Sequence, residues 1–345
     1  MQTSPFHLFA RWGEIGSPYP KALPAEGGTE KQTSGQTSQR LGFYRSWKPY
    51  LHSASFYDFI LGKESYFEFQ KKLSILAEES FGVSLALSCM VEVNVAGGVL
   101  TSSCYANPGS HPLWNVFLQK EPICILSVGV SEPGFEGKLK KLNSQVSSGK
   151  LTGKKSFITN GGEADFIFWV TKTEEKNPVY WVPVPKPEDS KFVLEKEEFH
   201  TDFACLVSHL RLFVSEYPIP EDSLLLEDYG PLGMELRLKE MCSLVSLLIG
   251  KTKVLSLKNP KIAEERNKLI QWQETFLSPV IGNPTKELLL EGFPYPIDTL
   301  IQTITSHYQL EKPEDLKTID PDWQLFLWED SFTKYLTQKK KRNLS

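Results

Sequence analysis

Hydrophobic residues recur three and four positions apart in the early part of the chain, and this spacing predicts amphipathic helices. It covers 56–62, 66–82 and 83–100. Because 83–100 carries no charge before Glu92, we expect it to form a central helix that is covered on several sides. Residues 1–45 are rich in Ser, Thr, Gly, Pro and Gln. Such a segment buries too little apolar surface to offset its ordering entropy, so we expect a flexible N-terminal arm.

The helical spacing of apolar residues ends at about Pro122 and returns after Asp222. Between these residues, short β-branched and aromatic runs alternate with Gly, Pro, Asn and Asp clusters, which is typical of antiparallel strands rather than of strand–helix–strand units. The strand-like runs are 123–130, 165–170, 179–186 and 210–220, and the helical runs that follow are 232–257, 261–281, 297–310 and 322–338.

We therefore expect a multidomain α+β protein. Its parts are a flexible arm at 1–45, a helical domain at 46–121, a central antiparallel β domain at 122–225 and a C-terminal helical bundle at 226–345. The motifs GxGxxG and GxxxxGK do not occur in the sequence, so it lacks the glycine-rich phosphate loops that these motifs form.

The composition is that of an ordinary soluble globular protein, with 40% hydrophobic residues, 23% charged residues and a net charge of -4. This balance argues against a nucleic-acid partner. The five cysteines are far apart and the six histidines show no ligand spacing, which predicts reduced thiols in a cytoplasmic protein and no metal site. The apolar run near 244–250 is too short to cross a bilayer and no signal-peptide pattern is present, so we expect no membrane partner.

Two polar turns in the β region carry candidate chemistry. The first reads Val-Ser-Glu-Pro-Gly-Phe-Glu-Gly-Lys and contains Ser131, and the second reads Ser-Phe-Ile-Thr-Asn-Gly-Gly and contains Thr159. Either turn alone is explained as a Pro- or Gly-containing connection between strands. That interpretation explains poorly why a hydroxyl residue stands at equivalent strand edges in both, beside glycines that allow another group to approach the backbone.

These turns resemble the middle-domain signatures of the acyl-CoA dehydrogenase family, (V/L)TEPGAGSD and WITNG, and they occur in the same order. Other segments are similar to the family's long N-terminal helix (77–100), its closing strand (210–225) and the first helix of its C-terminal bundle, from Arg237 on. The resemblance covers roughly 75–338. It implies a helical N-terminal domain, a central antiparallel β-barrel domain and a C-terminal helical bundle, which is shortened here.

The resemblance also implies an FAD cofactor at the edge of the β domain. It assigns flavin contacts to the backbone of Val130 and to the hydroxyl of Ser131. Thr159 falls near the redox-active nitrogen, and Phe157 replaces a tryptophan that packs on the flavin. Gln302 falls at the spacing of the glutamine in the family's QxxGGxGY motif. Serine keeps the hydroxyl of threonine, whereas phenylalanine keeps an aromatic face without the indole N–H.

The implied reaction is α,β-dehydrogenation of an acyl thioester, carried by CoA or by an acyl-carrier protein. A carboxylate removes the α-proton while FAD accepts the β-hydride. Glu329 falls on the glutamate of the family's IYEGT segment and is the candidate base, with a solvated glutamate on an amphipathic helix as the alternative interpretation. Glu235 is the second candidate, although it stands one residue out of register, with Leu236 at the expected position.

The resemblance implies substrate contacts at Gly137, Lys138 and Arg237, although a charged surface loop also explains Lys138. Ile262 replaces the arginine of the family's RxxFG segment and stands beside two acids, so Arg266 or Lys261 would have to supply the missing positive charge. The QxxGGxGY glycines are absent as well. These departures leave an alternative function, that of a catalytically inactive homologue acting as a scaffold or as the partner of an active relative. The shortened bundle favours a homodimer over the family's tetramer, and an electron-acceptor flavoprotein is the expected partner of an active enzyme.

Overall fold

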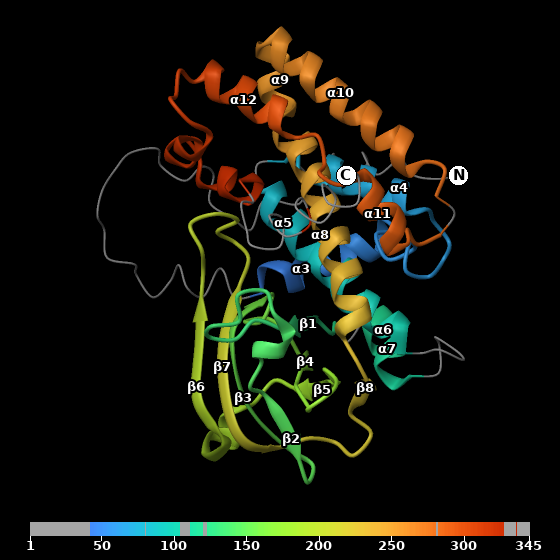
Figure 1. The fold of residues 1–345 in the computed structure, drawn as a ribbon, viewed down its shortest axis with the longest axis vertical. Coiled ribbons are helices and arrows are strands. Elements are labelled where there is room, and N and C mark those ends of the chain that lie inside the picture. The colour runs from blue at the N-terminus through green and yellow to red at the C-terminus, as the bar shows by residue number, and fades with distance from the viewer. Residues whose placement is uncertain are drawn as a thin grey trace.

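Helices come first along the chain, strands follow, and helices return (Figure 1). The computed structural model describes residues 42–79, 81–103, 111–119, 123–280, 282–327 and 336. The helices of the first part are α3 (Phe43–Ser53), α4 (Tyr66–Leu76), α5 (Gly82–Met90), α6 (Gly97–Ser103) and α7 (Pro112–Leu118).

Two expectations for this first part need revision. The segment 56–62 forms turns instead of a helix, because Ser55 and Gly62 on either side adopt positive φ angles, yet its aromatic residues are still buried in the core. α3 begins at Phe43, inside the segment 1–45 that was expected to be a flexible arm. The rest of that segment lies outside the described residues.

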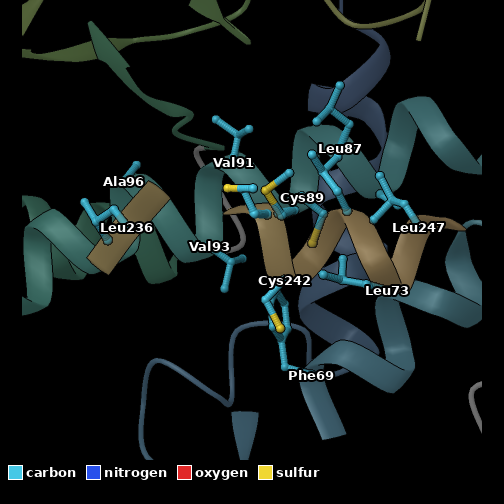
Figure 2. Packing of buried hydrophobic residues seen from close by; sticks show 14 of the residues in the cluster. Phe69, Leu73, Leu87, Cys89, Val91, Val93, Ala96, Leu236, Cys242 and Leu247 are labelled. Carbon is cyan, nitrogen blue, oxygen red and sulfur yellow. The ribbon is translucent and has the colours of Figure 1, made fainter. Parts of the chain in front are cut away.

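The most apolar segment of the first part forms one continuous helix in the core. α5 continues into a π-helical turn, Val91–Ala96, and then into α6. Figure 2 shows this helix antiparallel to α8 (Gly230–Lys251), with Leu87 near Leu247 and Ala96 near Leu236. Gly82–Ser103 is long and apolar enough to cross a membrane, but 89% of its most apolar stretch is buried inside the protein. A core position therefore explains its composition.

The β region consists of two four-stranded sheets, ordered β1-β4-β5-β8 and β2-β3-β7-β6. The strands are β1 (Leu126–Gly129), β2 (Gln145–Ser147), β3 (Lys150–Thr159), β4 (Phe166–Val170), β5 (Val179–Pro183), β6 (Val193–Phe199), β7 (His209–Pro218) and β8 (Leu224–Leu226). Both sheets contribute to one apolar cluster, which includes Trp169 of β4 and Leu212 of β7. The pairs are antiparallel as expected, except that β1 pairs with β4 in parallel. The chain passes through β2 and β3 between these two strands, and so long a connection permits parallel pairing.

The C-terminal helices after α8 are α9 (Lys253–Lys258), α10 (Pro260–Leu277), α11 (Lys286–Gly292) and α12 (Asp298–His307). α10 begins where Pro260 takes the first helical position and the Asn259 side chain accepts the N–H groups of the first turn. Of the predicted helix 322–338, a 3-10 turn at Pro321–Phe326 is seen. The remainder, apart from 327 and 336, lies outside the described residues.

Candidate active-site pocket

A cavity of about 660 Å³ lies where the β region meets the central helices. Its walls come from the π-helical turn, the segment after β1, the end of β3 and the start of α8. Val91, Val95 and Val128 contribute apolar surface, whereas Arg237 and Glu240 contribute opposite charges. Small-molecule sites typically enclose about 300–1,000 Å³ and combine apolar walls with a few polar groups, so this cavity has the character of a ligand site.

A β-bulge in β3 brings two of the predicted residues to the cavity. Alternate side chains are buried up to Lys155, and the register with β7 then shifts between Lys155 and Ile158. Because a bulge changes which side chains face the core, Ile158 is buried while Phe157 and Thr159 line the cavity. Phe157 keeps 37% of its surface exposed, and its ring centroid lies 4.3 Å from that of His209. The strand thus presents an aromatic face next to a hydroxyl.

The segment after β1 is held in place by a buried ion pair. Lys155 Nζ lies 2.7 Å from Glu132 Oε1, and both side chains are buried. The ammonium also donates to the Val130 carbonyl, while Glu132 accepts the backbone N–H of Ser144. Burial lowers the pKa of Lys155 to about 8, although Glu132 opposes this shift. The pair ties the turn that carries Val130 to strand β3, so that the two polar turns keep a fixed separation.

One face of α8 completes the cavity. Its lining residues recur at helical spacing, at Gly233, Leu236, Arg237 and Glu240. Arg237 Nη1 donates to Glu240 Oε2 at 2.8 Å, and the Glu240 side chain is 30% exposed. Burial, reinforced by the charge of Glu240, raises the pKa of the buried Tyr229 phenol far above its usual range. This phenol therefore stays protonated and is able to donate a hydrogen bond.

The cavity brings together many of the residues assigned from the resemblance. Those that line it are Val130, Ser131, Gly137, Phe157, Thr159 and Arg237. Ser131 and Thr159 use their main-chain carbonyls within the fold, where these accept hydrogen bonds from the side chains of Ser156 and Ser127. Two segments that are separated in the sequence thus place a hydroxyl residue each on one cavity wall.

Of the two predicted bases, Glu235 is among the described residues, and it does not line the cavity. Glu235 is turned toward Lys239, whose Nζ lies 2.7 Å from its carboxylate. Leu236 takes the cavity position instead, because successive residues of a helix point about 100° apart. Glu329 lies outside the described residues.

Lys138, predicted as a substrate contact, and Gln302, predicted as an FAD contact, are not part of the cavity lining. Both are exposed, and Gln302 lies on α12. Arg266 is buried: its Nε donates to the Ile249 carbonyl and its Nη2 lies 3.2 Å from Glu78 Oε1. The guanidinium is therefore committed to holding α10 against α8, and it does not compensate for the arginine that Ile262 replaces.

Three polar side chains of the cavity were not predicted from the sequence, Glu136, Tyr229 and Glu240. The signal for Glu240 was its place one helical turn after Leu236, on the same face of α8. In the part of the chain that the structure describes, no group of His, Cys, Asp and Glu forms a metal site. Among the described residues, Cys89, Cys124 and Cys242 are buried free thiols.

No protein-family model matches this sequence, and no curated protein matches it significantly. Solved structures do. The prolyl acyl carrier protein oxidase AnaB superposes with a TM-score of 0.62 at 11% identity, over 89% of this chain and 92% of that chain. PigA with FAD and proline gives 0.62 at 15% identity, over 90% and 91%.

Glutaryl-CoA dehydrogenase from Mycobacterium smegmatis in complex with FADH2 gives a TM-score of 0.55 at 14% identity, over 91% of this chain and 95% of that chain. These similarities show that the chain has the acyl-CoA dehydrogenase fold. The fold class expected from the two polar turns is therefore confirmed.

Proposed function

We propose that this protein binds FAD in the pocket and catalyses α,β-dehydrogenation of an acyl thioester. The observation that carries the proposal is the open cavity bounded by both polar turns, with Ser131 on one and Thr159 on the other. Proteins of the same fold are described with FAD or FADH2 bound, and their names include an acyl-carrier-protein oxidase and a CoA-thioester dehydrogenase.

The residues of the cavity suit a flat, polar-edged ring system. The exposed face of Phe157 offers a surface for stacking. Ser131 and Thr159 offer hydroxyl donors and acceptors at the edge of that surface. Ser131 and Thr159 border one cavity of about 660 Å³. When bound, FAD would supply the acceptor for the β-hydride of the substrate.

The chain itself supplies the proton chemistry. Glu240 is a carboxylate on the wall of the cavity that Val91 and Val95 also line, and Arg237 donates to it at 2.8 Å. A bound ligand that excludes water and separates this pair would leave a carboxylate suited to remove a weakly acidic α-proton. The protonated phenol of Tyr229 would polarise a thioester carbonyl, and Arg237, which donates to Glu240, adds a positive charge to the same wall. We propose Glu240 as the base, with Glu329 as the candidate that the sequence suggested.

One observation supports a different function, that of a catalytically inactive homologue serving as a scaffold or as the partner of an active relative. Arg266 is occupied by the Ile249 carbonyl and by Glu78, so it offers no cation to a pyrophosphate. A chain that binds only half of the cofactor with its own residues would hold it weakly. Retention of FAD therefore separates the two functions.

The experiment is to purify the protein, add FAD, remove the excess and record the visible spectrum, then to add butyryl-CoA or butyryl-pantetheine without oxygen. An enzyme retains flavin colour and bleaches, whereas a colourless protein supports the scaffold function. Glu240→Gln should retain FAD and slow bleaching by on the order of 100-fold or more. Glu235→Gln, on the same helix but off the cavity, is the matched control and should bleach normally. If Glu240→Gln bleaches at the normal rate and Glu329→Gln does not, the base is Glu329.

A further inference from the structure

Two side chains that line the pocket, Leu236 and Tyr229, each rest on a glycine. Leu236 is 1% exposed although it lines the cavity, and its Cδ2 lies 2.6 Å from where a Cβ on Gly98 would stand. The Tyr229 ring rests in the same way on Gly233, at 2.6 Å from the position of a Cβ there. At both places the side chain occupies the space that a side chain on the glycine would need.

The Leu236 side chain lies between the cavity and α6. Figure 2 shows it beside Ala96, at the seam where α8 meets the π-helical turn and α6. It lines the cavity and packs against Gly98, whose missing side chain leaves room for Cδ2. A ligand in this part of the cavity therefore meets a leucine side chain that is packed against the neighbouring helix.

We propose that Leu236 is a specificity-determining residue that restricts the pocket to thioesters of short or compact acyl groups. This inference rests on the proposed function and deepens it, because the same cavity of about 660 Å³ has to hold both the flavin ring and the acyl group. Removing the leucine side chain beyond Cβ opens the space in front of Gly98. An acyl chain then gains room for additional methylene groups.

The test measures binding by calorimetry with two unreactive probes, the S-butyl and S-octyl thioethers of pantetheine, on protein loaded with FAD. Burying one methylene strengthens binding about 4-fold. We expect the wild type to favour S-butyl, and Leu236→Ala to shift the preference toward S-octyl by on the order of 10-fold or more. Leu238→Ala is the matched control, because it removes the same atoms from a fully buried position of α8 that does not line the cavity. An unchanged preference in Leu236→Ala overturns the proposal.

A second variant and a second measurement keep the outcome decisive if Leu236→Ala folds poorly or if FAD is not retained. Gly98→Ala should push the leucine into the cavity and weaken S-butyl binding, because the new Cβ would stand 2.6 Å from Cδ2. Crystals of Leu236→Ala under xenon should show a site that is continuous with the pocket, and a closed wall there contradicts the proposal without any cofactor. If neither probe binds the wild type while xenon enters the variant, the proposed function fails and the role of the leucine in closing the cavity stands.

Discussion

The buried ion pair between Lys48 and Glu92 joins α3 to the wall of the pocket. Lys48 Nζ lies 2.7 Å from Glu92 Oε1, and neither side chain is more than 1% exposed. The other carboxylate oxygen accepts the hydroxyls of Tyr44 at 2.8 Å and Tyr57 at 2.6 Å. Glu92 Oε1 also accepts the backbone N–H of Leu126 at 2.9 Å. One carboxylate thus ties together α3, the π-helical turn and β1.

The substitution Glu92→Gln keeps the volume of the side chain but leaves the Lys48 ammonium buried without a counter-charge. Removing one partner of such a pair costs about 3–5 kcal/mol. Lys48→Met should cost less, about 2 kcal/mol, because the carboxylate keeps three hydrogen-bond donors. The double variant should lose less than the sum of the two, by at least about 1 kcal/mol, because it removes both charges together.

Urea unfolding followed by tryptophan fluorescence gives the free energy of unfolding of the wild type and the three variants. Glu264→Gln, which breaks the exposed pair between Glu264 and Lys268, is the control and should show no measurable loss. The reasoning is refuted if the single losses add to within about 0.5 kcal/mol in the double variant, since the two charges would then act independently.

Two further stability predictions concern His209 and Gly250. Burial, reinforced by the charge of His200, lowers the pKa of His209 from 6.5 to about 4. The unfolded chain therefore binds the proton more tightly, and the free energy of unfolding should fall by about 3 kcal/mol as the pH drops from about 6.5 to about 4. His209→Gln should flatten this dependence in urea unfolding at a series of pH values, and an equally steep profile would contradict the assignment. In Gly250→Ala the new Cβ would lie 2.2 Å from the Ser74 carbonyl oxygen. We therefore expect α4 and α8 to separate at a cost of about 1–3 kcal/mol in stability, despite the better helix propensity of alanine. A thermal midpoint at or above that of the wild type would show that the helices shift without cost.

The sequence predicted the helices and strands whose apolar residues are spaced with the period of that element. The helix over 83–100 and the strand over 165–170 were both read from spacing and β-branched runs. Strand β3 was missed because Lys150, Lys154 and Lys155 interrupt its apolar alternation. The burial of Lys155 depends on Glu132, a residue of another segment, and no local pattern shows this pairing.

The site was predictable where it depends on short motifs and unpredictable where it depends on packing. Ser131 and Thr159 were assigned from two turns, and the structure places both on one cavity. Glu240 was missed because the register was taken from the resemblance around Leu236 and not from the face of α8 that the fold turns inward. The parallel pairing of β1 with β4 was likewise beyond reach, since it joins segments that are separated by two other strands.

Because the helix Gly82–Ser103 contains the π-helical turn Val91–Ala96, it cannot lose a residue without changing which side chains face the pocket. A π-turn arises when one residue is added to an α-helix, and every residue after it is rotated by about 100° relative to those before it. Deleting any one residue of the turn would restore the regular helix and rotate its two halves against each other. Glu92 could then keep its partners only if Val95 left the pocket and Gly98 left Leu236. A single-residue deletion would therefore separate the anchored half of the helix from the half that shapes the cavity.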